Sequence, residues 1–367
     1  MTKTHIALIT SWNQKGGIAD YSERFVNALR DTESEVTVIP IKNPNTANPS
    51  LFNDIFNTIP ESVDIIHVQY EAGLFGRLGM SGICAPSFFL RAASIPTPVV
   101  TTLHEVHQSH SHQNVFADYL LRSRDLVIER FALWVSDRIV VHTETAKNIL
   151  TDRHDRNNHI VQMHHPVEVD AVAMDQQVAR SELGFEGPLL LTFGWIEEKK
   201  NYEQVVDVLP KIPTAQYLIA GSPRNENDSA VLKRTLNRAE KLGVADRVHH
   251  LGYVSDSAVQ TLFNAVDIVV LPYERVSQSG TLNLALGYER PVLTTALDPF
   301  EELRDEFGCP ATYEDTDELK RKLTNLLHNN QERENLSEHA AAYADKLTWN
   351  RFAENSQAIY CRVLDAV

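Results

Sequence analysis

A loop of small polar residues in the second half of the chain has the composition of an anion-binding site. Residues 277–281 read Ser-Gln-Ser-Gly-Thr; they follow an apolar run that ends at Leu271 and precede an expected helix from about residue 281 to 288. A loop that opens a helix in this way presents unpaired backbone N–H groups and the positive end of the helix dipole. The chemistry that this pattern favours is the binding of a phosphate group.

A pair of glycines near the N-terminus forms a second candidate loop. Gly16 and Gly17 stand between an apolar run at residues 6–10 and an expected helix at about residues 20–29. Glycine permits positive φ and a close approach of the backbone to a ligand. The motif fits either a ligand loop or a tight strand-to-helix turn. Two such loops, one in each half, suggest a cleft between two similar domains.

Lys200 ends a charged run that begins at Glu197 and follows an apolar run at residues 189–193. A lysine at a strand-to-helix corner can reach a phosphate as a point charge. The other charges of this run are better explained as solvated surface residues. Two common nucleotide motifs are absent. Gly16 and Gly17 lie outside any G-x-G-x-x-G fingerprint, and no G-x-x-x-x-G-K-[ST] sequence occurs.

The elements that must position these residues alternate between β-rich apolar runs and amphipathic segments. Such alternation predicts βαβ units and parallel sheets. The fold class is therefore α/β, with two Rossmann-like doubly wound parallel-sheet domains facing a cleft. The expected strands are residues 6–10, 35–40, 65–69, 99–103, 138–142 and 160–164 in the first half, and 189–193, 216–220, 248–251, 268–271 and 292–295 in the second.

The length of 367 residues exceeds the size at which one hydrophobic core keeps growing, so two domains are expected. Residues 167–187 lose strand character and become polar, which places the boundary near residue 170. The first domain is then residues 1–169 and the second residues 170–348. The tail, residues 349–367, has apolar residues at helical spacing and could pack back on the first domain.

Composition limits the partners of this protein. The net charge of -15 argues against nucleic acid, because phosphate backbones demand clustered Lys and Arg. No apolar run approaches the roughly 18 residues that a membrane span needs. The three cysteines show no paired or metal-type spacing, and no signal-type apolar segment opens the chain. We expect a cytoplasmic protein.

Taken in order, the motifs resemble the family 4 retaining glycosyltransferases of the GT-B fold. The resemblance covers nearly the whole chain, and the Gly-Gly-Ile-Ala-Asp-Tyr and Ser-Gln-Ser-Gly-Thr sequences look most like its mannosyltransferase-like bacterial branch. It is carried by residues 16–17, 102–105, 193–194, 200–201, 220–221, 251–254 and 277–292.

The resemblance implies roles for individual residues. Lys200 and the backbone amides at the start of the loop's helix would hold the diphosphate of a nucleotide-sugar donor. His104, which ends the apolar run at residues 99–103, would contact the transferred sugar from the carboxyl edge of the first sheet; a capping role at this edge is the alternative. The expected catalytic residues are thus Lys200 and His104. The expected donor-binding residues are Gly16, Gly17, Gly194, Tyr253, Val254, Gln278, Ser279, Gly280 and Thr281.

Side chains near His104 have two interpretations each. Glu71 and Glu105 could orient sugar or acceptor hydroxyls, or lie solvated at the surface. His107, His110 and His112 form a histidine-rich stretch that could bind zinc, but no Cys and no second His pair completes a site, so an acceptor-side loop is favoured. No metal and no cofactor is expected.

The sequence also departs from the family pattern. Many members carry two glutamates eight residues apart, the second of which binds the ribose; Val276 and Leu284 stand at these positions. Glu274 lies two residues before the first of them. Trp195 replaces an arginine or lysine that often follows the glycine corresponding to Gly194. Ribose recognition by this chain is therefore left without its usual carboxylate.

The function that the resemblance implies is that of a metal-independent, retaining hexosyltransferase. It would move a hexose, with mannose the first candidate, from a nucleotide diphosphate sugar to a glycan hydroxyl in polysaccharide or oligosaccharide synthesis. The alternative is a non-catalytic protein that binds glycan or nucleotide sugar. A sugar epimerase would need acid and base carboxylates that the sequence does not identify. Peripheral membrane contact through residues 120–134 is open, but an ordinary domain helix explains this segment more simply.

Overall fold

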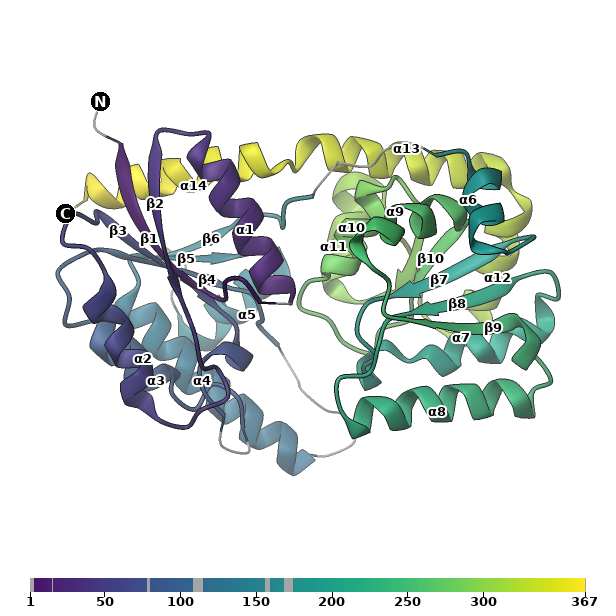
Figure 1. The fold of residues 1–367 in the computed structure, drawn as a ribbon, viewed down its shortest axis with the longest axis horizontal. Helices are drawn as coiled ribbons and strands as arrows, with labels where there is room; N and C mark the ends of the chain where they lie inside the picture. The colour runs from purple at the N-terminus through teal and green to yellow at the C-terminus, as the bar shows by residue number, and fades with distance from the viewer. Residues whose placement is uncertain are drawn as a thin grey trace. The chain divides into compact units, whose positions relative to one another are not determined.

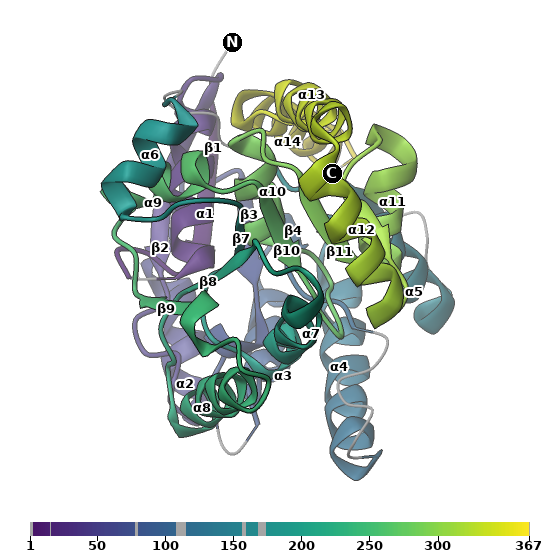
Figure 2. The same cartoon turned by 90° about the vertical axis from the view of Figure 1, so that its right-hand side faces the viewer.

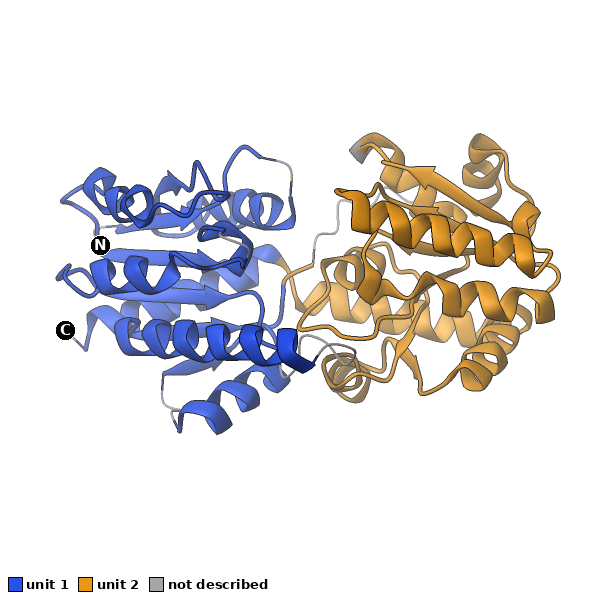
Figure 3. Cartoon of the chain, turned by 90° about the horizontal axis from the view of Figure 1, so that it is seen from below, with its two compact units in different colours: residues 1–165, 349–367 blue, residues 166–348 orange. Residues whose placement is uncertain are grey.

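The chain forms two compact units, coloured separately in Figure 3. Unit 1 comprises Met1–His165 and Trp349–Val367, and unit 2 comprises Pro166–Thr348. The sequence placed the boundary near residue 170. The computed structural model describes residues 3–14, 16–77, 80–107, 115–155, 159–167 and 174–366.

Unit 1 contains a six-stranded parallel sheet with the order β2-β1-β3-β4-β5-β6. Its central strands are buried on both faces, which explains why apolar residues predominate in them. The strands expected from the sequence are all present, with ends that differ by up to two residues. They are β1 (Thr4–Thr10), β2 (Ser34–Pro40), β3 (Ile65–Tyr70), β4 (Val99–Leu103), β5 (Arg138–Val141) and β6 (Ile160–Gln162).

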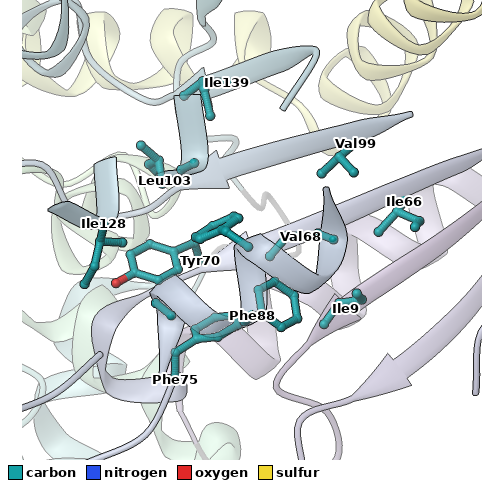
Figure 4. Packing of buried hydrophobic residues seen from close by; sticks show 14 of the residues in the cluster. Ile9, Ile66, Val68, Tyr70, Phe75, Phe88, Val99, Leu103, Ile128 and Ile139 are labelled. Atoms are coloured by element: carbon teal, nitrogen blue, oxygen red, sulfur yellow. The ribbon is translucent and has the colours of Figure 1, made fainter. Parts of the chain in front are cut away.

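Helices cover both faces of this sheet (Figure 1). They are α1 (Gly17–Arg30), α2 (Pro49–Asn53), α3 (Ala85–Ala92), α4 (Val115–Val135), α5 (Glu144–His154) and α14 (Trp349–Leu364), with 3-10 helices η1 (Asp54–Thr58) and η2 (Ala72–Leu74). One face packs against α2, α3, α4 and α5. Tyr70, Phe75, Phe88 and Ile128 meet in this core, as Figure 4 shows.

The opposite face of the first sheet packs against α1 and α14, which lie beside each other. Phe25 of α1, Phe352 of α14 and Tyr360 of α14 are buried there. Side chains alternate between the faces of a strand, so β3 directs His67 and Gln69 to the same face as Ile65. The C-terminal helix therefore covers a polar stripe on the central strands of unit 1.

Unit 2 contains a second six-stranded parallel sheet, with the order β12-β11-β10-β7-β8-β9. Its expected strands are present, and the edge strand β12 was not predicted because it has only three residues. The strands are β7 (Leu189–Phe193), β8 (Gln216–Ala220), β9 (Val248–Gly252), β10 (Ile268–Leu271), β11 (Val292–Thr295) and β12 (Ala311–Tyr313).

The helices of unit 2 also cover both sheet faces: α7, α8 and α12 pack on one face, and α6, α9, α10 and α11 on the other (Figures 1 and 2). Among the described residues, no helix is long and apolar enough to cross a bilayer. The helices are α6 (Gln176–Leu183), α7 (Tyr202–Val208), α8 (Glu226–Lys241), α9 (Asp256–Ala265), α10 (Gly280–Gly287), α11 (Asp298–Phe307), α12 (Thr316–His328) and α13 (Asn330–Lys346), with 3-10 helices η3 (Glu198–Lys200), η4 (Leu209–Lys211) and η5 (Ala245–Arg247).

Candidate functional site

The carbonyl of Phe193, at the end of β7, joins two side chains that the sequence singled out. Lys200 ends η3 and is only 5% exposed, and its Nζ donates a hydrogen bond to Phe193 O at 2.8 Å. Thr281 in the first turn of α10 donates its Oγ1 hydrogen to the same oxygen at 3.4 Å. Lys200 and Thr281 are 81 positions apart in sequence but meet at one strand end, because β7 and β10 are neighbours in the sheet.

Glycine is required at the turn between β7 and η3. Gly194 has φ of +95°, and a Cβ there would lie 2.9 Å from Lys200 Nζ and 3.2 Å from Thr281 Oγ1. Glycine is required even more strictly at Gly221, which follows β8, because a Cβ on this residue would lie 2.0 Å from the carbonyl oxygen of Gly194. The two glycines let adjacent loops touch through their backbones, which brings the lysine and the helix start together.

The start of α10 offers backbone donors beside this lysine. Ser279 is the N-cap, and its Oγ accepts a hydrogen bond from Leu282 N at 3.1 Å. The N–H groups of the first helical residues, Gly280 and Thr281, have no intrahelical acceptor by the geometry of a helix start. Gly280 is exposed. A cation and a helix N-terminus that meet in this way form a site for a phosphate or diphosphate.

Burial sets the charge state of the lysine. It lowers the pKa of Lys200 to about 7, although Glu197 acts in the opposite direction. The Nζ lies 5.9 Å from the centre of the Tyr273 ring. Burial also raises the pKa of Tyr273 to about 12, and hydrogen bonds with Thr281 and Ser279 oppose this rise. A bound anion would favour the charged form of the lysine.

Arg224 is a cation near this site that the sequence did not single out. It lies in the loop between β8 and α8, and its guanidinium carbon is 5.9 Å from the centre of the Trp195 ring. Its charge helps to lower the pKa of Lys200, and it pairs with Glu197 and Asp228. The available signal was its position just after Ala220-Gly221, a strand end beside β7. Trp195 thus contacts an arginine instead of supplying one.

The other expected donor-binding residues of unit 2 differ in exposure. Gly252 ends β9 with φ of +68°, and its carbonyl accepts a hydrogen bond from Gly221 N at 2.7 Å. Tyr253 is 55% exposed, whereas Val254 is half-buried. Gln278 is half-buried too, and its Oε1 is closed off from solvent without a hydrogen-bond partner in the described part of the chain.

Apolar side chains that pack on the core stand at the two positions where the family pattern has glutamates. Val276 and Leu284 are partly buried and pack against the hydrophobic core of unit 2. Glu274 is exposed, and its backbone N–H donates to Lys199 O at 2.8 Å. The first turn of α10 contains no acidic residue. Its positive end is therefore not neutralised from within the helix.

In unit 1, Gly16 is the N-cap of α1 with φ of +151°, and its carbonyl accepts hydrogen bonds from Ala19 N and Asp20 N. A Cβ on Gly16 or Gly17 would meet no other atom within 4 Å. The positive φ explains why residue 16 is a glycine. Steric crowding explains a glycine neither at residue 16 nor at residue 17.

His104 follows β4 and is only 2% exposed. Its Nε2 donates to Oε1 of Gln69 at 2.7 Å, while its Nδ1 is buried and has no partner among the described residues. Burial holds the pKa of His104 well below the usual value, and the nearby His142, His165 and His67 lower it further. The ring is therefore a neutral imidazole with one unused acceptor.

Aromatic and histidine rings surround this imidazole. The Tyr21 ring lies edge-on to it at 4.8 Å between centroids, and the His142 ring lies at 5.3 Å. The ring centroid of Trp349, the first residue of α14, lies 4.9 Å from that of Tyr21. The Tyr21 hydroxyl, His142 Nε2 and Trp349 Nε1 are also buried without a partner in the described ranges. Each such group costs about 1–3 kcal/mol if it stays unpaired, so this cluster favours a bound water or ligand hydroxyl.

The weaker expectations in unit 1 differ in exposure. Glu71 is half-buried and Glu105 is exposed. His110 and His112 lie outside the described residues. Among the residues that are described, no group of three His, Cys, Asp or Glu side chains is arranged to hold a metal ion. A cavity of about 520 Å³ lies between α4 and α5, lined by residues that include Phe131, Trp134 and Arg153, and it contains none of the expected site residues.

Comparison with solved structures defines the class of protein. The fold resembles that of sucrose-phosphate synthase from Thermosynechococcus elongatus, with a TM-score of 0.80, 15% identity and coverage of 100% of both chains. It also resembles Anabaena HepE in complex with UDP and glucose, with a TM-score of 0.74, 14% identity and coverage of 97% of this chain and 99% of that one. The protein has the GT-B fold, with a doubly wound parallel sheet in each unit.

The family follows from unit 2. Residues 175–343, which contain Lys200 and α10, match the family model of the glycosyl transferases group 1. A curated relative, the GDP-mannose:glycolipid 4-beta-D-mannosyltransferase of Xanthomonas campestris pv. campestris, is 24% identical over 273 residues, which cover 72% of this chain and 70% of the relative. The matches to three curated relatives span from 26 to 70% of those proteins' lengths.

Proposed function

We propose that this protein is a retaining hexosyltransferase of the cytoplasm. It transfers a hexose, with mannose the first candidate, from a nucleotide diphosphate sugar to a glycan hydroxyl in polysaccharide or oligosaccharide synthesis. The observation that carries the proposal is the meeting of Lys200 Nζ and Thr281 Oγ1 on the Phe193 carbonyl, beside the start of α10. The names of relatives agree with such a donor: one is described as using GDP-mannose, and a structural neighbour is described as bound to UDP and glucose.

The chemistry follows from where charge develops. When the bond between the anomeric carbon and the donor's β-phosphate oxygen breaks, negative charge builds on that phosphate. Lys200 and the N–H groups at the start of α10 stabilise this charge more strongly in the transition state than in the bound donor. The acceptor oxygen then bonds to the anomeric carbon on the face that the phosphate leaves, and its proton passes to the departing phosphate. This route needs no metal, and it gives retention.

His104 has a different role in the proposal. Its imidazole is neutral, and it meets a hydroxyl of the sugar to be transferred through the nitrogen that lacks a partner. Gly16 and Gly17 keep the start of α1 free of side chains, so the donor can approach that backbone. Glu71 and Glu105 are the acceptor-side candidates.

The first experiment is a thermal unfolding screen with UDP, GDP, ADP and dTDP, run on the wild type and on Lys200→Ala. A ligand that binds only the folded state raises the unfolding temperature by mass action. We expect one nucleotide to raise it in the wild type and the rise to be lost in the variant. Turnover of the matching sugar nucleotide with and without glycan acceptors then tests transfer. If a folded sample responds to none of the four, the nucleotide-sugar proposal is wrong.

A non-catalytic role is the second candidate, because Val276 and Leu284 pack in the core where related enzymes place carboxylates. In that case a nucleotide sugar binds but is not turned over with any acceptor.

A further inference from the structure

We infer that Gln69 is a positioning residue that holds His104 in a single tautomer, so that Nδ1 of His104 acts as a hydrogen-bond acceptor for a sugar hydroxyl. This inference rests on the proposed function for the identity of the hydroxyl, but the tautomer itself is a property of unit 1 alone. It concerns a residue to which neither the motifs nor the comparisons assign a role.

The amide oxygen of Gln69 decides the tautomer. Oε1 can only accept, so the His104 nitrogen that lies 2.7 Å away, Nε2, must carry the hydrogen. In a neutral imidazole the other nitrogen then has no hydrogen. Nδ1 of His104 is therefore an acceptor, and it is buried without a partner in the described part of the chain.

The orientation of the Gln69 amide is supported by its other end. With its hydrogen on Nδ1, the His67 ring donates to the Tyr360 hydroxyl at 2.6 Å, and its Nε2 accepts from the Thr102 hydroxyl at 2.8 Å. The Gln69 Nε2 shares this acceptor at the longer distance of 3.4 Å. In this assignment the Gln69 amide accepts from His104 at one end and donates towards His67 at the other.

Each member of this chain is closed off from water. His67, Gln69, Thr102 and His104 are at most 2% exposed, and Tyr360 of α14 is fully buried. A buried amide that is bonded at both ends cannot rotate without losing both contacts. The C-terminal helix thus contributes to the orientation of a histidine that lies 256 positions earlier in the sequence.

The remaining groups around His104 keep it neutral. The titratable side chains that face it are His67 of β3, His142 after β5, His165 after β6 and Tyr21 of α1. None of these is an acid that would stabilise an imidazolium near neutral pH. The Tyr21 ring lies edge-on to the imidazole at 4.8 Å between centroids, and its own hydroxyl is also buried without a partner in the described ranges.

The direct test is a long-range ¹H–¹⁵N NMR spectrum of the protein labelled at histidine, with His104 assigned by comparison with His104→Asn. We expect Nε2 of His104 to show the shift of a protonated nitrogen and Nδ1 that of an unprotonated one at pH 7. In Gln69→Met, which removes both hydrogen bonds at similar volume, the two tautomers should mix. A spectrum of the wild type with the hydrogen on Nδ1 overturns the inference, whether or not the variant folds.

The activity test uses a matched control. Gln216→Met removes a Gln–His bond of the same kind in unit 2, where Gln216 Oε1 lies 2.9 Å from His249 Nε2. We expect Gln69→Met to lower kcat by about tenfold with little change in KM, since one hydrogen bond to the sugar is lost in part. Gln216→Met should leave kcat unchanged. Equal kcat for Gln69→Met and wild type contradicts the positioning role.

Gln69→Glu separates positioning from structure. A carboxylate at this place accepts the same hydrogen bond but raises the pKa of His104. Below that new pKa the imidazole is charged and Nδ1 becomes a donor, so the kcat of the variant, taken relative to that of the wild type at the same pH, should fall at low pH and recover as pH rises. A variant whose turnover does not depend on pH in this way contradicts the inference. If the wild type turns over no sugar nucleotide, the proposed function fails while the NMR result still decides the tautomer.

Discussion

Gly194 and Lys200 share one small volume: the position that a Cβ on Gly194 would take lies 2.9 Å from Nζ of Lys200. The lysine occupies the place of the missing side chain and hydrogen-bonds the carbonyl of the preceding residue, Phe193. The absence of a side chain at residue 194 therefore leaves room for the Lys200 ammonium group. We expect replacement of this glycine to displace that group rather than the hydrophobic core.

Gly194→Ala should reduce turnover more than it reduces stability. The added methyl group displaces the flexible end of Lys200 and strains a residue with φ of +95°, which costs about 1–2 kcal/mol. Gly184→Ala is the control, because Gly184 also has positive φ but would meet no atom within 4 Å. Chemical denaturation should show similar losses for both variants, whereas kcat should fall only for Gly194→Ala. A similar kcat for the two variants would show that the position of Lys200 does not matter.

Removal of the lysine should weaken the transition state directly. We expect Lys200→Ala to lower kcat by about 10²- to 10³-fold, the usual effect of losing one donor to a developing oxyanion. Lys241→Ala, at the exposed end of α8, changes the net charge equally and should keep wild-type kcat. Initial rates at saturating donor measure both. A loss below about threefold for Lys200→Ala would remove it from the mechanism.

Binding of a nucleoside diphosphate should take up a proton above neutral pH. Burial lowers the pKa of Lys200 to about 7, so the amine of this lysine is largely deprotonated at pH 8 in the ligand-free protein. An anion stabilises the charged form and raises this pKa. Affinity should therefore be highest below pH 7 and decline as pH rises through that value. Titration calorimetry at pH 8 in buffers of different ionisation enthalpy measures the uptake.

The matched variant for this measurement is Lys200→Met, in which any residual binding should occur without proton uptake. The same shift affects folding with a known sign. Since the unfolded lysine titrates near 10.5 and the folded one near 7, the unfolded state holds more protons between these values, and the free energy of unfolding should rise with pH across that window. Lys200→Met should lose this contribution, and identical pH dependence in the two proteins would contradict the shift.

The N-cap of α10 should contribute both to stability and to binding. Ser279→Ala removes the acceptor of Leu282 N and should lower the free energy of unfolding by about 1 kcal/mol. Asp315→Ala removes the equivalent cap of α12, where the carboxylate accepts from Glu318 N at 2.8 Å. Both should be destabilised in urea, but only Ser279→Ala should bind the nucleotide less tightly. Unchanged affinity in Ser279→Ala would argue against an anion at this helix start.

Much of the fold could be predicted because its strands are buried on both faces. β10 is continuously apolar and β4 is rich in β-branched residues, and these signals need no tertiary information. β12 was not predicted, because a three-residue strand at a sheet edge is too short to show a recognisable hydrophobic pattern. Lys200 and the loop that caps α10 could be named for the same local reason, since a strand end followed by a helix start is visible in the sequence.

Contacts that cross the sequence could not be predicted in this way. Arg224 comes close to Lys200 because β8 lies beside β7, and its position just after a strand end does not by itself show which strand is the neighbour. Likewise, Gln69 reads as one polar residue within an apolar strand. Its importance appears only when His104 of the neighbouring strand end is found 2.7 Å away.

The sequence by itself determined the alternation of strands and helices, the chemical types at their ends and hence the two-domain α/β class, because these depend on short-range burial patterns. The GT-B class came from the resemblance of its ordered motifs to a known family. The tertiary structure decided which donor meets which acceptor. Parallel pairing of β3 with β4 and the packing of α14 over them bring Tyr360, His67 and Gln69 into one chain of hydrogen bonds. Hydrogen bonds act over about 3 Å, so only the folded arrangement of distant segments could assign the hydrogen on His104 to one nitrogen.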